Sequence, residues 1–333
     1  MTVSKDLKKR IRERQARTGE SYTTARMHVL GEQMEVLAPE VSEPMALEGV
    51  VLKVNQTSAR IRVLGEVGQV TFRSGELNGI EPMVPGHVVS ILVEKRWDWR
   101  GDAYASGKVE SARIDIPQLG LTPLSLDGGA VHDVREHSEP HRGRDEYSKL
   151  WRKLTAKPRP SYEFEGIAWG ALSDDDLDDN PTCEAAELRR AGLVAEATAL
   201  LMDTLGRDLR VLDAHAGLGS IVFDRSPKNA MLHYEIGVRI GELSLPVGFD
   251  GLLLWGHLYN RPFLRCLHGY GLCRWRLGDF GGAKTVFERI LSFNPNDNQG
   301  ARFCWDDVRR GLTWEEMQER EDNVEAERHQ ELQ

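Results

Sequence analysis

The hydrophobic and polar positions of residues 1–38 predict two helices joined by a tight turn. One apolar stripe at helical spacing carries Leu7 and Ile11, and a second carries Ala25, Val29 and Leu30. Gly19 lies between the stripes, and glycine tolerates the left-handed conformation that ends helices. We therefore expect a helical hairpin over 1–38.

Residues 45–116 change to the pattern of short β-strands. Runs rich in valine and isoleucine alternate partly between apolar and polar positions, among them ALEGVVLKVN, SARIRVL, GQVTFRS and HVVSILVEKRW, and glycines separate them. Several short strands in a segment of this length indicate a barrel or a compact sandwich. The order of strands and loops resembles that of S1-like OB-folds. The resemblance implies a small barrel over 45–116 of the kind that binds single-stranded nucleic acid.

The stretch 117–180 is rich in glycine, proline and charge, which is typical of an extended linker. Within it, DEYSKLWRKLTAK has the pattern of a short helix, and Pro158 stops that helix because proline cannot continue one. Asn180 and Pro181 have the sequence of a helix start, with asparagine as the cap and proline in the first helical position. The sequence thus predicts a linker with one short helix.

Two groups of candidate metal ligands fall in this linker, and neither predicts a metal site. His132, His137 and His141 lie in an extended stretch, whereas a metal site needs a rigid set of ligands. SDDDLDDNP has acids at the spacing of an EF-hand, but Pro181 stands where that loop requires glycine. We expect neither a metal nor another cofactor.

The most specific pattern of the chain lies between Arg261 and Asp297. It places large apolar, small and turn residues at fixed positions, namely Leu267, Tyr270, Gly271, Gly278, Phe280, Ala283, Phe287, Ile290 and Pro295. Small residues let two antiparallel helices approach, large ones fill the space between neighbouring pairs, and proline ends the unit. The pattern resembles a tetratricopeptide (TPR) repeat, which implies a helix pair that stacks on similar pairs.

Two weaker copies precede this repeat. One repeat length separates Ala197 from Ala230, whereas Ala230 and Ala283 are separated by one repeat and an insertion near 243–260. We expect a TPR-like α-α helical stack over 181–315, with NDNQGARFCWDDVRRGL as its capping helix. Residues 316–333 form an acidic tail, either a frayed helix end or a segment that covers the stack.

The resemblance implies a concave groove lined by the first helix of each pair. The groove positions are Arg265, His268, Leu272, Trp275 and Arg276 in the clear repeat, with Gln299, Arg302 and Asp306 on the capping helix. Arg265, Arg276 and Arg302 form a basic patch suited to an acidic peptide, or else a solvated face. The alternative interpretation of Trp275 is that it packs between helices.

A basic N-terminal segment is a first candidate for contact with nucleic acid. Residues 4–28 hold eight lysines and arginines against three acids, and the candidate contacts are Lys8, Lys9, Arg12 and Arg26. TGESYTTA resembles the helix–turn–helix junction of ribbon-helix-helix antitoxins, which bind DNA. The alternative interpretation is a solvated hairpin or docking tail.

A second candidate lies on one hairpin of the barrel. Aromatic and basic residues alternate there, namely Lys95, Arg96, Trp97, Trp99, Arg100 and Tyr104. Proteins that bind single strands combine aromatic rings for the bases with cations for the backbone. The alternative is that these rings close the barrel or pack against a neighbouring domain.

Charge and composition narrow the class of protein. A net charge of −9 argues against a general nucleic-acid coat. No apolar run reaches the ~18 residues of a membrane span, and the charged start MTVSKDLKKRIRERQ lacks the apolar region of a secretory signal. Four cysteines in 333 residues fit reduced thiols. We expect a cytoplasmic protein without a membrane partner.

No group of residues predicts catalysis. Asp213 and His215, and also His233 and Glu235, combine histidine with carboxylate near helical segments. Pairs of this kind are common by chance, and His215 already occupies a packing position of the repeat pattern. Cys266 and Cys273 share one helical face and are expected in the core.

These patterns together predict a multidomain α+β protein with an N-terminal helical hairpin, a small OB-like β-barrel and a C-terminal TPR-like stack. The leading interpretation is a non-catalytic adaptor that binds a protein or acidic peptide in the groove. The alternative is a factor associated with single-stranded nucleic acid. The pattern indicates neither the partner's identity nor an oligomeric state.

Overall fold

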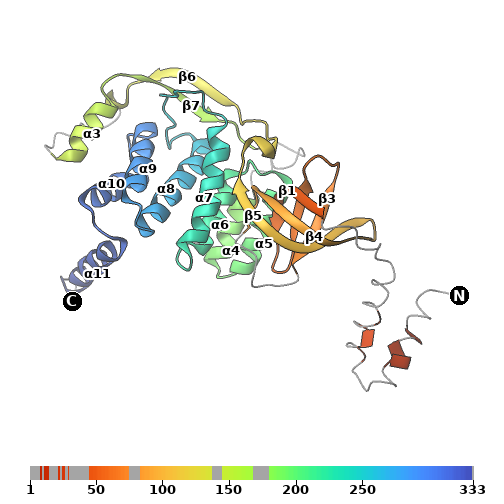
Figure 1. The fold of residues 1–333 in the computed structure, drawn as a ribbon. Helices are drawn as coiled ribbons and strands as arrows, with labels where there is room; N and C mark the ends of the chain where they lie inside the picture. The colour runs from red at the N-terminus through yellow and green to blue at the C-terminus, as the bar shows by residue number, and fades with distance from the viewer. Residues whose placement is uncertain are drawn as a thin grey trace. The chain divides into compact units, whose positions relative to one another are not determined.

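The structure, a computed structural model, describes residues 45–74, 83–136, 145–167 and 180–331, together with scattered residues between 8 and 29. The described residues fall into two compact units, one drawn from 1–49, 56–81 and 89–111 and the other from 50–55, 82–88 and 112–333. The expected mixture of α and β structure is confirmed. A barrel occupies the middle of the chain, and helices make up its C-terminal part (Figure 1).

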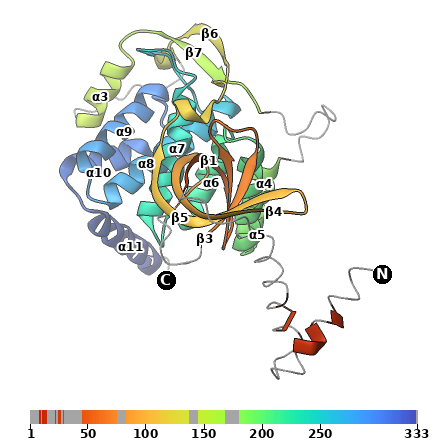
Figure 2. The ribbon, with the colours of Figure 1, turned by 45° about the vertical axis from the view of Figure 1, so that its right-hand side comes forward.

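Five strands close into a barrel (Figure 2). They are β1 (Met45–Val54), β2 (Ala59–Val63), β3 (Gln69–Ser74), β4 (His87–Trp99) and β5 (Asp102–Ile114), in the order β1-β2-β3-β5-β4. β3 runs antiparallel to β2 and parallel to β5. Ile61, Phe72 and Ile91 are fully buried, and their sequence neighbours face outward because successive side chains of a strand point to opposite faces. The predicted barrel is therefore confirmed.

Two further strands occupy the segment expected to be a linker. β6 (Leu126–His132) and β7 (Arg159–Phe164) pair antiparallel. Between them in the chain lies α3 (Glu146–Leu154), whose first turn is capped by Asp145 accepting a 2.8 Å hydrogen bond from the Ser148 N–H. Glycines in β6 and a proline in β7 hide the strand pattern, since both residues are rare in strands.

Helices α4 to α11 make up the chain from 181 to 331. Their bounds are Pro181–Arg190, Val194–Arg207, Leu212–Val222, Pro227–Glu242, Arg261–Arg276, Phe280–Phe293, Ala301–Arg310 and Trp314–Glu331. Asn180 accepts a 2.9 Å hydrogen bond from the Thr182 N–H, so the predicted cap of α4 is confirmed. Within the described residues, no helix is both long and apolar enough to cross a membrane.

Neighbouring helices pack in sequence order, and alternate helices also touch. α6 contacts both α7 and α8, α8 contacts α9, and α4 and α6 meet directly (Figure 1). A Cβ atom on Gly271 of α8 would lie only 2.8 Å from the Phe287 ring of α9, so this crossing requires glycine. Ala230 and Ala283 are fully buried. These predicted small positions therefore lie at buried positions of the helices, and Gly271 lies at a close helix crossing.

The insertion near 243–260 fastens β7 to the helices. The Leu252 N–H donates to the Pro160 carbonyl at 2.8 Å, and the Leu252 carbonyl accepts from the Tyr162 N–H at 2.9 Å. The next residue, Leu253, donates to the carbonyl of Phe293 at the end of α9 (2.9 Å). The insertion thus supplies a strand-like edge that the repeat pattern does not contain.

The turn before α10 depends on one buried carboxylate. Asp297 is 5% exposed and accepts hydrogen bonds from the Ala301 N–H (2.6 Å) and from the Arg302 guanidinium (2.8 Å). Its φ of 51° lies in the left-handed region, which costs other side chains more than aspartate. Asp297 therefore caps α10 and also holds the arginine that follows the cap.

We expect Asp297→Ala to lower the free energy of unfolding by about 2–4 kcal/mol, because it removes a helix cap and leaves Arg302 without its carboxylate. Urea unfolding measures the loss. Glu319→Ala, at an exposed carboxylate of α11, is the matched control and should cost under ~1 kcal/mol. Equal stability of Asp297→Ala and the wild type would contradict the assignment.

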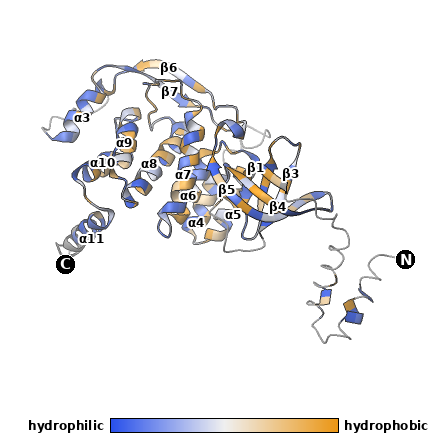
Figure 3. Ribbon diagram, viewed as in Figure 1, coloured by the Kyte–Doolittle hydropathy of each residue, from blue (hydrophilic) through white to orange (hydrophobic). Residues whose placement is uncertain are grey.

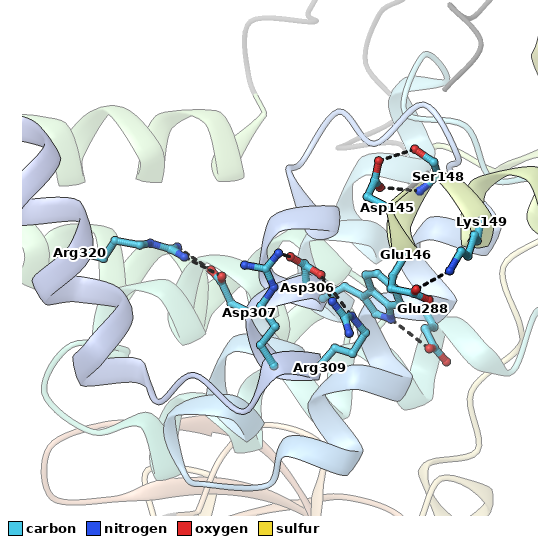
Figure 4. Close-up of polar contacts among 11 residues, drawn as sticks. Asp145, Glu146, Ser148, Lys149, Glu288, Asp306, Asp307, Arg309 and Arg320 are labelled. Atoms are coloured by element: carbon cyan, nitrogen blue, oxygen red, sulfur yellow. Dashed lines mark hydrogen bonds and ion pairs between the residues drawn. The ribbon is translucent and has the colours of Figure 1, made fainter. Parts of the chain in front are cut away.

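Contacts around α10 hold the start of the acidic tail (Figure 4). Asp307 accepts from Arg320 of α11 at 2.7 and 2.6 Å, and the Trp305 indole donates to Glu288 of α9 at 2.9 Å. Met317 of α11 is also buried. The first turns of the tail therefore pack on α10, although α11 is mainly hydrophilic (Figure 3).

The described residues of the N-terminal segment are helical. Ile11, Ala25 and Val29 are buried together in one small cluster. All three belong to the two predicted stripes, whose other members Leu7 and Leu30 lie outside the described residues. The turn between the stripes, and the remainder of 1–38, lie outside the described residues, as do His137, His141 and the acidic run 174–179.

Candidate functional site

The β4–β5 hairpin turns through Arg100 and Gly101. Both residues have positive φ, 55° and 89°, as a two-residue turn between twisted strands requires. Asparagine or glycine usually fills the first of these positions, and an arginine there costs on the order of 1 kcal/mol. An unfavourable residue at an exposed turn suggests that its side chain serves another purpose.

Three aromatic rings gather beside this turn. Trp97 and Tyr104 face each other across the hairpin, with ring centroids 5.6 Å apart and planes 13° from parallel. Trp99 meets the edge of Tyr104 at 6.4 Å and is 49% exposed. A cluster of three rings, half-buried at Trp97 and Tyr104 and exposed at Trp99, is unlike the single apolar residues that scatter over most protein surfaces.

Arginine side chains lie on the faces of these rings. The guanidinium of Arg100 lies 4.4 Å from the Trp99 ring centre, and that of Arg73 lies 5.3 Å from the Tyr104 ring centre. Among the described residues, neither guanidinium has a carboxylate partner. Both cations therefore remain available to a ligand.

Strand register extends the basic surface beyond the hairpin. Arg60 of β2 is paired with Thr71 of β3, which is paired in turn with Tyr104 of β5. These positions alternate with buried residues, so Arg60 and Arg73 share the outer face with the rings. The sequence analysis missed both arginines, although the alternation in SARIRVL and GQVTFRS contains the information needed to find them.

The remaining predicted nucleic-acid residues differ in their availability. Arg96 is engaged by Glu66, with a shortest distance of 2.9 Å, and this hydrogen bond lowers the pKa of Glu66. Lys95 is half-buried. In the N-terminal segment, the exposed residues include Lys8, Lys9, Arg12 and Arg26.

The rings and arginines that share the outer face of the barrel are together called the barrel patch. Its residues are Arg60, Arg73, Trp97, Trp99, Arg100 and Tyr104.

The helical region contains a cavity of about 420 Å³ bordered by α4, α6 and α8. The predicted groove residues Arg265, His268 and Gln299 line it, as does Leu272. Burial lowers the pKa of His268 to about 4, so its imidazole is neutral at physiological pH. The structure therefore brings half of the predicted groove residues to one cavity.

The other predicted groove residues are held in structural contacts. Trp275 is 2% exposed and donates its indole N–H to the Leu312 carbonyl at 2.8 Å. Arg276 donates to the carbonyls of Phe223 (2.9 Å) and Asp224 (3.1 Å) at the end of α6. Arg302 is held by the buried Asp297. The expected patch of Arg265, Arg276 and Arg302 is thus divided among separate partners.

The residues weighed for catalysis do not converge. Asp213 faces the cavity and accepts two hydrogen bonds of 2.9 Å from Arg265, whereas His215 is fully buried. Burial raises the pKa of the Cys266 thiol, which disfavours a nucleophilic thiolate. His233 is buried on α7, with its pKa lowered to about 3.

A polar chain that the sequence analysis missed joins Ser161, His257 and Glu163. The Ser161 hydroxyl lies 3.3 Å from His257 Nε2, and Glu163 lies 3.3 Å from His257 Nδ1. The second Glu163 oxygen accepts from the Tyr259 N–H at 3.2 Å. Since all three contacts join β7 to the 252–260 loop, the chain fixes that loop. Residues 96 positions apart offer no local pattern that could reveal it.

The chain matches no protein-family model and no curated protein.

Proposed function

We propose that the barrel binds single-stranded nucleic acid through the barrel patch. The observation that carries the proposal is the cluster of Trp97, Trp99 and Tyr104 beside one hairpin, where the Trp99 ring is exposed and two arginines lie over ring faces. Bases stack on aromatic rings whatever their sequence, and arginines bind the phosphates between them. The proposal therefore concerns binding without strong sequence preference.

A single strand fits the barrel patch better than a duplex. The faces of bases in a duplex are covered by their neighbours, and unstacking one step costs a few kcal/mol. In a single strand the faces are accessible. A base that stacks on Trp99 displaces Arg100 from the ring, and the freed guanidinium is then close to the adjacent phosphate.

We also propose a more specific fold for each of three parts of the chain. The strand order, with β3 parallel to β5, supports an OB-like barrel. Packing between consecutive and alternate helices supports TPR-like pairs over 181–310. The cluster of Ile11, Ala25 and Val29 supports an N-terminal hairpin.

We further propose that the protein acts by binding rather than by catalysis. His215 is fully buried, whereas Asp213 lines the cavity, so the two side chains do not meet in one site.

Fluorescence anisotropy with labelled twelve-nucleotide poly-uridine and poly-thymidine tests the proposal. One phosphate contact from each of the three arginines of the barrel patch predicts a roughly 20-fold loss of affinity between 50 and 200 mM salt. Arg73→Gln and Arg100→Gln should each reduce the slope of log K against log salt by about 0.7. Arg190→Gln, at an exposed arginine of α4, is the charge-matched control. Absence of binding at 50 mM salt would refute the proposal.

A further inference from the structure

A second cavity in the helical region, of about 260 Å³, is bordered by α7, α8 and α9. Tyr270 and Arg274 of α8 line it, whereas Arg265 and His268 of the same helix line the 420 Å³ cavity. At 3.6 residues per turn, these two pairs lie on opposite sides of α8. The second cavity is therefore separate from the predicted groove, and we call it the arginine cavity.

Three arginines, one from each helix, line the arginine cavity. They are Arg239 of α7, Arg274 of α8 and Arg289 of α9. Among the described residues that line it, Glu242 is the only carboxylate, and it pairs with both Arg289 and Arg239, the latter at 3.2 Å. The lining therefore has more guanidinium groups than carboxylates. All three arginines are partly exposed, so a ligand from solution can reach them.

Two further carboxylates contact these arginines without lining the cavity. Glu235 lies 3.4 Å from Arg239, and Asp279, the cap of α9, lies 2.9 Å from Arg274. A guanidinium has more N–H donors than these contacts use. The Nε atom of Arg274 is in fact buried without a partner among the described residues. Buried polar atoms are normally paired, so this unused donor needs an explanation.

Two glycines in the first turn of α9 let Arg274 lie against that turn. Gly281 and Gly282 both line the cavity, although glycine is among the least favourable residues in a helix and the repeat pattern requires neither. A Cβ atom at Gly282 would lie 1.9 Å from a terminal nitrogen of Arg274. The Tyr270 ring, whose centre is 4.8 Å from the Arg274 guanidinium, also contacts it. A cation thus lies at the start of a helix, an end that itself favours negative charge.

We infer that the arginine cavity binds a phosphate group, either the free ion or a small phosphomonoester, through Arg274 and Arg289. Guanidinium groups form charge-assisted, often paired, hydrogen bonds with phosphate oxygens. Arg289 exchanges Glu242 for the phosphate, and Glu242 retains Arg239. The cavity volume exceeds that of the ion, so a few further atoms of an ester also fit. The inference goes beyond nucleic-acid binding and depends on none of the residues of the barrel patch.

Calorimetric titration of the intact protein with inorganic phosphate, at constant ionic strength, tests the inference. We expect saturable binding, and a loss of affinity of about tenfold or more in Arg274→Gln and in Arg289→Gln, because each removes charge-assisted hydrogen bonds. Glu242→Gln should instead raise the affinity about threefold or more, because it removes a negative charge that competes for Arg289. Arg190→Gln, at an exposed arginine of α4 outside the cavity, should change the affinity less than twofold.

The inference would be overturned by the absence of saturable binding at millimolar phosphate, or by equal affinity in the wild type and both arginine variants. Weaker binding in Glu242→Gln would also overturn it, because the cluster would then be a structural network only. Circular dichroism checks that each variant remains folded. If an arginine variant does not fold, the opposite sign expected for Glu242→Gln still decides.

Two further titrations identify the ligand and separate this site from the barrel patch. Glycerol 3-phosphate is compared with inorganic phosphate, and the tighter of the two shows whether the site favours an ester or the free ion. A loss of phosphate affinity in Arg100→Gln would place the phosphate at the barrel patch and overturn the inference. Failure of phosphate binding at the arginine cavity and failure of nucleic-acid binding are thereby distinguished.

Discussion

Trp97→Ala is expected to lower the affinity for a single-stranded twelve-nucleotide RNA or DNA by about 5- to 150-fold. This range corresponds to the roughly 1–3 kcal/mol that stacking of one base on an aromatic ring contributes. Trp97 also supports Tyr104 from the opposite strand, so its removal affects two rings of the barrel patch. Anisotropy titration at low salt measures the change.

Two further variants test whether the loss of affinity comes from the missing ring at position 97. Trp97→Phe keeps a ring at this position and should retain most of the affinity. Phe303→Ala removes an aromatic side chain that is 61% exposed in the helical region, and it should leave the affinity unchanged. Thermal unfolding shows whether each barrel remains folded. A folded Trp97→Ala protein with wild-type affinity would contradict stacking at this site.

Acid should destabilise the helical region through its buried histidines, among them His215 and His233. Burial lowers the pKa of His215 to about 4, and burial together with the positive charge of neighbouring histidines lowers that of His233 to about 3. In the unfolded chain both histidines have a pKa near 6.5. Between pH 6.5 and the lowered pKa values, the unfolded chain therefore binds more protons than the folded chain. Stability therefore falls as pH decreases through 6.5, and the loss is complete only below the folded pKa values.

Each histidine contributes a slope of up to about 1.4 kcal/mol per pH unit in this window. Between pH 6 and 4.5 the two together are expected to lower the free energy of unfolding by about 4 kcal/mol. Urea unfolding at several pH values measures the slope. His233→Gln should reduce this slope by about 1.4 kcal/mol per pH unit, whatever the substitution does to stability at pH 7. An unchanged slope in both His233→Gln and His215→Gln would contradict the assignment.

The barrel could be predicted because each of its strands has a local pattern. Alternation in SARIRVL and HVVSILVEKRW separates inward from outward residues without reference to the remainder of the chain. The same alternation places Trp97 and Trp99 on the outside. Their distances to Tyr104 and Arg73 depend on the pairing of three strands, which no single run contains.

The groove could be predicted only in part, for a physical reason. The helical pattern indicates which face of a helix holds Arg265 and His268, and both residues line the cavity. It does not encode what the side chain meets there. The carbonyls at the end of α6 bind Arg276, and the buried carboxylate of Asp297 binds Arg302.

The most direct test of nucleic-acid binding by the barrel is photocrosslinking. A twelve-nucleotide poly-uridine that contains 4-thiouridine is irradiated with the intact protein, and mass spectrometry locates the attachment site. We predict adducts at Trp97, Trp99 or Tyr104, lost when unlabelled poly-uridine is added in excess. Adducts confined to the basic N-terminal segment around Lys8 and Arg26, or to the helices, would contradict the account.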